Sequence, residues 1–304
     1  MVRVLPETLS PGVRRITLQG GDVTLSALLA EPATPAPRAV VVALHGGGMR
    51  AGYFDGQAHP DLSLMTLGAG LGYTVLSVDR PGYGRSAALL PDGQTLTEQS
   101  VTLHRALDHF TSRYAVGAGF FLVAHSYGGK LALTAAGDGR NAGLLGLDMS
   151  GCGHRYAVDP DGLLDARGAR LWMRNWGPLR SYPPDTFRTS ATLVAPMPAR
   201  ERRDAVRWPD LFPGIAAKVR VPVRLTFAAH EDYWLHDEDS LADLTARLAA
   251  PRVLVDRVPD AGHNVSLGWA ARSYHLKALA FLEECLACRA VSGRSAPTPA
   301  APAA

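Results

Sequence analysis

Six short apolar runs, separated by segments of helical character, are the feature of this sequence that most restricts its fold. The first, AVVVALH at residues 39–45, is continuous and rich in β-branched side chains, as expected of a strand buried on both faces. Strands that alternate with helices form crossover units, and crossover units build a parallel sheet. The sequence therefore predicts an α/β fold. The other five runs cover residues 73–79, 120–125, 144–150, 221–229 and 252–258.

An antiparallel hairpin is predicted ahead of these runs. Residues 13–19 and 23–30 alternate between apolar and polar side chains on either side of Gly20-Gly21, a pair typical of a tight turn. A mostly parallel central sheet flanked by helices follows from the order of the elements. The helices are predicted near residues 60–71, 95–114, 127–137, 238–250 and 266–288.

The alternation stops at residues 151–215, which hold eight prolines and several aromatic side chains. A segment this long between two strands needs structure of its own and often covers a functional site. We expect residues 1–150 and 216–290 to form one α/β core, with residues 151–215 (the insertion) as a helical lid. The alanine- and proline-rich end of the chain, residues 291–304, is expected to be disordered.

Charge and hydropathy argue against several partners. The net charge is only +3 and no block of like charges occurs, which disfavours nucleic acid and an anionic membrane as the main partner. No run approaches the ~18 apolar residues that a membrane span requires. Residues 1–15 hold no apolar segment of the kind found in a signal peptide, so the cytoplasm is the expected location.

The cysteines and histidines do not indicate a metal site. Cys285 and Cys288 form a CxxC, but they fall in a predicted helix, and no second pair is present to complete a zinc site. We interpret them as small helix residues. The histidines and carboxylates of residues 230–237 lack a recognised ligand spacing, so neither a metal nor a cofactor is expected.

The segment FLVAHSYGGK, residues 121–130, carries the strongest chemical signal. A buried strand ends just before Ser126 and a helix begins just after it. This arrangement is typical of a nucleophile elbow, in which small flanking residues permit a tight turn and the serine is held exposed in a strained conformation. The usual pattern is G-x-S-x-G, and Ala124 replaces the first glycine but is still small. Ser126 is therefore the predicted nucleophile.

A serine nucleophile needs a base, and the base needs an orienting carboxylate. In chains with a nucleophile elbow the three residues occur in the order serine, acid, histidine along the sequence. His263 follows the last apolar run in a glycine-bearing loop and is the predicted base. Two carboxylates follow the fifth run, and we assign Asp232 as the acid and Glu231 as a solvated side chain. Asp148, at the end of the fourth run, is the fallback acid.

A glycine-rich turn, His45-Gly46-Gly47-Gly48, directly follows the first apolar run. An HGGG loop of this kind supplies a backbone N–H to an oxyanion hole, and the residue after the nucleophile supplies a second. Glycine lets the backbone approach the developing oxyanion because it has no Cβ. The predicted donors are Gly47, Gly48 and Tyr127. We interpret His45 as a side chain that braces the loop.

With these segments in order, the chain resembles the α/β-hydrolase superfamily from about residue 13 to residue 288. The motifs that carry the resemblance are HGGG at 45–48, DRPGYGRS at 79–86, AHSYGG at 124–129, AAHED at 228–232 and AGHN at 261–264. The resemblance implies an α/β-hydrolase fold and a serine esterase- or thioesterase-like chemistry. In DRPGYGRS it implies a turn whose aspartate, arginine and glycines brace a loop.

Aromatic residues near the predicted site are candidates for a substrate pocket: Trp172, Trp176, Tyr233 and Trp234. The arginines interleaved with the two insertion tryptophans favour a second hypothesis, that the insertion binds a carboxylate or the phosphates of a carrier thioester. A solvated helix face is the alternative. The arginines are Arg155, Arg167, Arg170, Arg174 and Arg180.

The expected function is hydrolysis of a small-molecule carboxylic ester or thioester through an acyl-enzyme on Ser126. Acyl transfer, cyclisation and C–C bond hydrolysis use the same triad and stay open. Related dehalogenases and epoxide hydrolases place aspartate at the elbow, so the serine argues against both. A non-catalytic ligand receptor on the same scaffold is the alternative from another class, and the intact serine, acid and histidine argue against it.

Overall fold

An eight-stranded sheet runs through the centre of the protein. The computed structural model describes residues 8–140, 143–159 and 169–294. Within these residues the strand order is β1-β2-β4-β3-β5-β6-β7-β8. The strands are β1 Arg14–Gln19, β2 Thr24–Ala30, β3 Val40–Leu44, β4 Thr74–Val78, β5 Phe120–His125, β6 Leu144–Ser150, β7 Val223–His230 and β8 Val253–Gly262.

Six of the strands, from β4 to β8 in the sheet order, are parallel to one another. The first two form the antiparallel part: β1 pairs with β2, and β2 pairs with β4. The predicted hairpin and the predicted, mostly parallel sheet are both confirmed. Each predicted apolar run became a strand, and β3, β4 and β5 are buried along their whole length.

Side-chain alternation along the strands creates two apolar cores, one on each face of the sheet. In β3, Val40 and Val42 face the first core, whereas Val41 and Ala43 face the second. The same alternation holds along β5. Because successive residues of a strand point to opposite faces, a fully apolar run needs helices on both sides.

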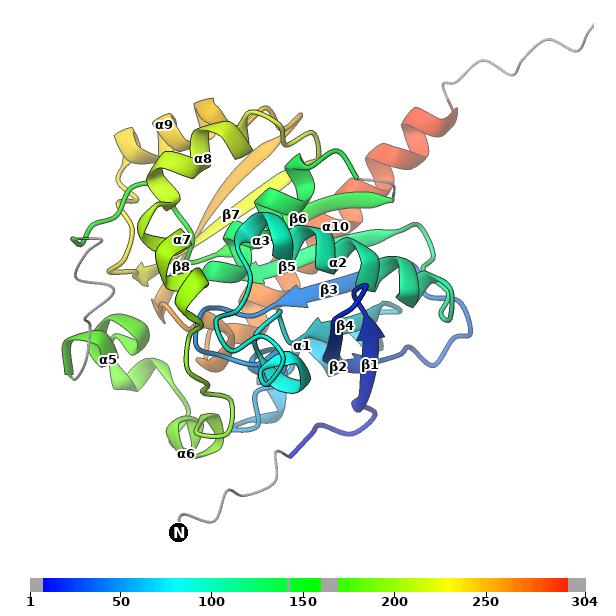
Figure 1. Cartoon of the computed structure of the whole chain (residues 1–304), viewed down its shortest axis with the longest axis horizontal. Coiled ribbons are helices and arrows are strands. Elements are labelled where there is room, and N and C mark those ends of the chain that lie inside the picture. The colour runs from blue at the N-terminus through cyan, green and yellow to red at the C-terminus, as the bar shows by residue number, and fades with distance from the viewer. Residues whose placement is uncertain (1–7, 141–142, 160–168, 295–304) are drawn as a thin grey trace, which may run out of the picture.

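Helices supply this cover on both faces (Figure 1). The first core includes side chains of α2 (Leu96–Thr111), α3 (Tyr127–Gly137), α8 (Trp208–Ala216) and α9 (Glu238–Arg247). The second includes side chains of α1 (Leu64–Gly70) and α10 (Ala271–Arg294). Short 3-10 helices are η1 Ala51–Phe54, η2 Pro60–Leu62, η3 Gly84–Ser86, η4 Leu179–Ser181 and η5 Val265–Leu267.

The insertion lies between β6 and β7 and is helical over much of its described length. Besides η4 and most of α8, it contains α5 (Ala169–Trp176), α6 (Thr186–Ser190) and α7 (Ala199–Val206). At the other end of the chain, α10 continues to Arg294, past residue 291, where we expected the tail to begin. The rest of that expected tail lies outside the described residues. No helix in the described part combines the length and apolarity needed to cross a membrane.

A buried ion-pair network joins β6 to β7, β8 and α10. Asp148 is fully buried and accepts hydrogen bonds from Arg224 and, at 2.7 Å, from the Tyr274 hydroxyl. The other arm of Arg224 lies 2.5 Å from Asp256. Removing one partner of such a pair leaves a charge in the interior without its counter-ion, which costs more than the pair itself contributes.

We therefore expect Arg224→Met to lower the free energy of unfolding by about 3–5 kcal/mol, because Asp148 would stay buried without its cation. Urea denaturation followed by circular dichroism measures this change. The control is Arg14→Met, which breaks an exposed pair with Glu31 and should cost less than about 1 kcal/mol. Equal losses in the two variants would contradict the argument.

The pH dependence of stability is expected to include His275 of α10. Burial lowers the pKa of His275 to about 3, below the value of about 6.5 that it has in the unfolded chain. Between these two pKa values the unfolded state binds a proton that the folded state does not. The free energy of unfolding therefore falls as the pH drops below about 6.5. The slope from this one residue is about 1.4 kcal/mol per pH unit down to about pH 3.

His275→Gln should make the acid-induced loss of stability shallower by about that amount between pH 6 and pH 4. Urea denaturation at pH 6, 5 and 4 provides the slopes. Ser266→Ala is the matched control, since it removes the hydroxyl 3.0 Å from His275 Nε2 but keeps the titrating ring. A slope that is the same in His275→Gln and in the parent would refute the assignment.

Candidate functional site

The candidate site lies at the edge of the sheet where the parallel strands end. His45 follows β3, Ser126 follows β5, Glu231 follows β7 and His263 follows β8. Carboxyl ends of neighbouring parallel strands meet at one edge, so residues far apart in the sequence are brought together there. The predicted elements therefore place the predicted serine and histidine on the same edge.

Ser126 occupies the turn between β5 and α3 with φ 53° and ψ −116°. Among the described residues, Asp260 is the only other non-glycine with positive φ. A side chain in this region of backbone space is strained and persists only where the surroundings impose it. The Ser126 amide donates to the Ser150 carbonyl at 2.8 Å, whereas its hydroxyl has no hydrogen-bond partner among the described residues. The hydroxyl of this half-buried residue is therefore free to meet a ligand.

The glycines after Ser126 permit a very close approach between α3 and β3. A Cβ on Gly128 would lie 2.2 Å from the Leu44 carbonyl oxygen, and one on Gly129 would lie 2.9 Å from Cys152 Cβ. Only glycine fits at Gly128, because the nearest atom is backbone and cannot move aside. The start of α3 is thereby fixed against the start of the HGGG loop. The helix also directs its free N-terminal N–H groups to this edge of the sheet.

His263 pairs with Glu231 and not with Asp232, so the structure contradicts our choice of acid. His263 Nδ1 lies 2.7 Å from Glu231 Oε2, and both residues are buried, whereas Asp232 is exposed. β7 continues to His230, so Glu231 is the first residue after the strand and the one directed into the site. An ionised carboxylate only accepts, so Nδ1 carries the proton and Nε2 remains available as a base.

The backbone of Tyr233 and of Gly151 borders the Glu231 carboxylate. The Tyr233 amide donates to Glu231 Oε1 at 3.0 Å, and the Trp234 indole donates to the Gly151 carbonyl at 2.8 Å. Gly151 has φ 58°, and a Cβ there would lie 2.8 Å from the His263 ring and 3.1 Å from Glu231 Oε2. The acid–histidine pair is thus packed against the backbone that follows β6.

The fallback acid, Asp148, is engaged elsewhere. Both of its carboxylate oxygens accept hydrogen bonds from Arg224 and Tyr274 within the sheet, as described above. Burial raises its pKa, although the Arg224 guanidinium opposes this effect. Asp148 therefore belongs to the structural network and not to the candidate site.

His125, which precedes the serine, is buried and packed. Its ring stacks on Tyr53 at a centroid distance of 4.7 Å, and its Nδ1 lies 3.1 Å from the Ser150 hydroxyl. Burial and then the neighbouring His263 hold the pKa of His125 well below its usual value. A neutral ring that lies 4.6 Å from the His263 ring packs against the base without adding a charge beside it.

Two of the three predicted oxyanion donors keep a free N–H. No described residue accepts a hydrogen bond from the amide of Gly47 or of Tyr127. The amide of Gly48, in contrast, donates to the Tyr83 hydroxyl at 3.0 Å. Gly48 is thus removed from the predicted set, because its only backbone donor already has an acceptor.

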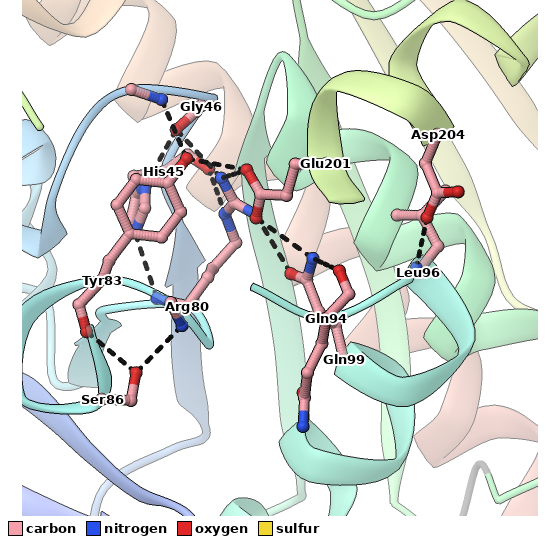
Figure 2. A network of polar contacts seen from close by, with 12 residues as sticks. His45, Gly46, Arg80, Tyr83, Ser86, Gln94, Leu96, Gln99, Glu201 and Asp204 are labelled. Atoms are coloured by element: carbon pink, nitrogen blue, oxygen red, sulfur yellow. Dashed lines mark hydrogen bonds and ion pairs between the residues drawn. The ribbon is translucent and has the colours of Figure 1, made fainter. Parts of the chain in front are cut away.

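Arg80 braces the glycine-rich loop from beneath (Figure 2). Its Nε donates to the His45 carbonyl at 2.8 Å, and its Nη2 donates to the Gly46 carbonyl at 3.1 Å. The Arg80 amide donates to His45 Nε2 at 3.1 Å, so the His45 proton is on Nδ1, which lies 2.8 Å from the Gly46 carbonyl. Burial, followed by the charge of Arg80, keeps the pKa of His45 well below its usual value. His45 is therefore a neutral part of the loop.

The candidate pocket residues fall in different places. The Tyr233 ring lies 4.8 Å from the His263 ring and is half-buried, so it borders the site. Trp234 is buried beneath it, and Trp176 packs within the insertion against Tyr182. Trp172 is in α5, and its side chain lies outside the described residues.

A buried cation, Lys130, was overlooked in the sequence. It is 3% exposed and follows the two elbow glycines, and burial lowers its pKa. Its Nζ lies 4.4 Å from the Trp234 ring centroid and 5.4 Å from that of Trp208. Tyr156 and Tyr127 complete this aromatic cage at 6.0 Å each. Trp234, a member of the first apolar core, thus also forms one wall of the space around Lys130.

The remaining predicted features stay peripheral. Arg155 and Arg180 are exposed, and the side chains of Arg167 and Arg170 lie outside the described residues. Cys285 is buried in α10, whereas Cys288 is exposed on the same helix. In the part of the chain that is described, no group of three or more histidine, cysteine or carboxylate side chains is arranged to hold a metal ion.

Comparison with known sequences gives one family match. A sequence model described as "Alpha/beta hydrolase family" matches residues 41–273, which include every residue of the candidate site. None of the curated proteins matches the sequence.

Solved structures match the fold over almost the whole chain. A carboxyl esterase from Bacillus coagulans matches with a TM-score of 0.66 at 15% identity, covering 91% of this chain and 100% of its own. A monoglyceride lipase from Saccharomyces cerevisiae matches at 0.67 and 14% identity, covering 92% and 98%. A proline iminopeptidase from Mycobacterium smegmatis matches at 0.60 and 16% identity, covering 91% and 100%. Identities this low establish the fold alone.

The pairing of His263 predicts which carboxylate matters. Glu231→Gln should slow the reaction of Ser126 with an activated ester by about three to four orders of magnitude, because an amide neither fixes the Nδ1–H tautomer nor stabilises the imidazolium. Asp232→Asn, one residue away and exposed, should react at nearly the parent rate. The rates are measured with p-nitrophenyl butyrate, and circular dichroism verifies the fold. A loss confined to Asp232→Asn would restore Asp232 as the acid.

Proposed function

Because the chain belongs to the alpha/beta hydrolase family, we propose that it cleaves a small-molecule carboxylic ester or thioester through an acyl-enzyme on Ser126. One observation carries the proposal: a strained serine at a strand–helix turn shares a sheet edge with a buried histidine–carboxylate pair. Solved structures of this fold include an esterase, a lipase and a peptidase, so the fold alone is compatible with several leaving groups. The serine, histidine and carboxylate together are what favour transfer of an acyl group to Ser126.

In the first step, His263 Nε2 removes the Ser126 proton as the hydroxyl oxygen attacks the substrate carbonyl. The imidazolium that forms is stabilised by the Glu231 carboxylate at Nδ1. A buried carboxylate is effective here because the low surrounding dielectric strengthens its interaction with the developing charge. Glu231 therefore takes the role that we first gave to Asp232.

The carbonyl oxygen becomes an oxyanion, which the amides of Gly47 and Tyr127 are placed to stabilise. Gly46, the residue before Gly47, lies next to the serine: a Cβ on Gly46 would be 3.2 Å from Ser126 Cβ. Tyr127 is the first residue of α3, so the positive end of the helix dipole adds to its N–H.

The tetrahedral intermediate then collapses, and the C–O or C–S bond to the leaving group breaks. The alcohol or thiol leaves with the proton held by His263. In the second half, His263 removes a proton from water, the resulting hydroxide attacks the acyl carbon, and Ser126 is released with its proton restored. No cofactor takes part in these steps.

We propose that the insertion covers this site. A Cβ on Gly262 would lie only 2.1 Å from the Trp176 carbonyl oxygen, so the end of α5 packs directly on the loop that carries His263. The Asn264 amide group donates to the Asn175 carbonyl at 2.9 Å, and the Tyr233 hydroxyl donates to the Asn175 side chain at 2.9 Å. Such contacts support an insertion that covers the loop carrying His263.

Labelling with a fluorophosphonate tests the nucleophile directly. The parent protein should gain one phosphonyl adduct at Ser126, detected by mass spectrometry, and Ser126→Ala should not be labelled and should lose ester turnover by several orders of magnitude. Ser112→Ala, at the exposed end of α2, is the control and should label like the parent. Turnover that survives in Ser126→Ala would refute the proposal.

A series of p-nitrophenyl esters and matching thioesters from acetyl to decanoyl then separates the substrate classes. Turnover with added butylamine or butanol distinguishes hydrolysis, which forms only the free acid, from acyl transfer to the added nucleophile.

A further inference from the structure

The carboxylate of Glu201, in the insertion, is buried in the core next to the glycine-rich loop. Glu201 of α7 and Arg80 form an ion pair in which both side chains are completely buried. Glu201 Oε2 lies 3.2 Å from Arg80 Nη2, and Oε1 is in contact with Nη1 and accepts from the Gln99 amide at 3.1 Å. Figure 2 shows that the guanidinium lies between this carboxylate and the loop.

The hydrogen bond from Arg80 to the Gly46 carbonyl sets the direction of the Gly47 N–H, a predicted oxyanion donor. The Gly46 carbonyl and the Gly47 N–H belong to the same planar trans peptide, so they point in opposite directions. Arg80 Nη2 holds the Gly46 carbonyl toward itself at 3.1 Å. The Gly47 N–H must therefore point away from Arg80. A rotation of this one peptide plane would redirect the donor.

A second connection joins Glu201 to the same loop. The Tyr83 hydroxyl donates to Glu201 Oε2 at 2.7 Å and accepts from the Gly48 amide at 3.0 Å. Burial, and then the nearby Glu201 charge, keep the pKa of Tyr83 well above its usual value, so this hydroxyl remains a donor. Glu201 is thus linked to the Gly46 carbonyl through Arg80 and to the Gly48 amide through Tyr83.

The chain just before Glu201 packs on the outer side of the loop. The Ala195 amide donates to the Gly48 carbonyl at 2.9 Å, and a Cβ on Gly47 would lie 3.0 Å from Met197 Sδ. The glycine-rich loop is therefore held between the insertion on one side and Arg80 on the other.

We propose that Glu201 is a positioning residue for the oxyanion hole. The inference rests on the proposed acyl-enzyme chemistry. Without the carboxylate, Arg80 would be a buried cation without a counter-ion, and a buried cation draws in water or changes its conformation to recover one. In either case the Gly46 carbonyl loses its fixed partner and the Gly47 donor loses its fixed direction.

The test compares three variants of the full-length protein. Glu201→Gln removes the charge at nearly constant shape. Tyr83→Phe keeps the Glu201–Arg80 pair and removes the hydroxyl that joins Glu201 to the Gly48 amide. Asp204→Ala is the matched control. It lies one turn further along α7 and removes a buried carboxylate that accepts from the Leu96 amide at 2.7 Å, so it weakens the docking of the helix without touching the loop.

In Glu201→Gln, kcat for p-nitrophenyl butyrate should fall by about 10- to 100-fold with KM within about twofold, because an oxyanion donor acts in the transition state. Affinity for a trifluoromethyl ketone, which binds as an oxyanion, should fall by the same factor. Tyr83→Phe should show a smaller loss of the same kind, and Asp204→Ala should keep the parent kcat.

Parent-like kcat in Glu201→Gln, a change in KM alone, or an equal loss of kcat in Asp204→Ala would overturn the inference. If Glu201→Gln does not fold, as judged by circular dichroism, Tyr83→Phe decides: a loss of kcat supports the inference and parent kcat overturns it. Fluorophosphonate labelling separates the two proposals. A parent protein that is not labelled at Ser126 refutes both, whereas equal labelling rates in the parent and Glu201→Gln refute only this one.

Discussion

The parallel alignment of six strands is the constraint on which the candidate site depends. It brings the residues that follow β3, β5, β7 and β8 to one edge of the sheet, although they are far apart in the sequence. The alignment in turn requires helices on both faces, because central strands such as β3 and β5 are apolar on both sides. The two cores, the strained turn at Ser126 and the buried His263–Glu231 pair are consequences of this arrangement.

Most of the fold could be predicted because its signals are local. An apolar run such as residues 120–125 fits only a strand buried on both faces, and the glycines after Ser126 mark a place where backbone meets backbone. The serine and the histidine could be assigned from their places after these strands. Glu231 could not, because β7 continues one residue beyond the apolar run to His230, and in the extended chain near a strand end adjacent side chains point in different directions.

The parts that escaped prediction depend on contacts between distant segments. Gly48 has the same local sequence signal as Gly47, and only the hydroxyl of Tyr83 distinguishes them. Glu201 lies among arginines in an otherwise polar helix, so its local sequence resembles an exposed face. Lys130 is similar, because a lysine in a helix is expected to reach solvent, and the rings that enclose it come from three separate segments. In each case the partner sets the environment, and the partner's location is a property of the complete fold.

The buried pair of Arg80 and Glu201 also ties the insertion of this protein to its α/β core. Arg80 lies in the turn after β4, in the α/β core, whereas Glu201 lies in the insertion. A chimaera of this chain that received its insertion from a donor without an acidic residue at the equivalent of position 201 would enclose a guanidinium with no counter-ion. An insertion grafted onto this core therefore has to bring its own carboxylate for Arg80.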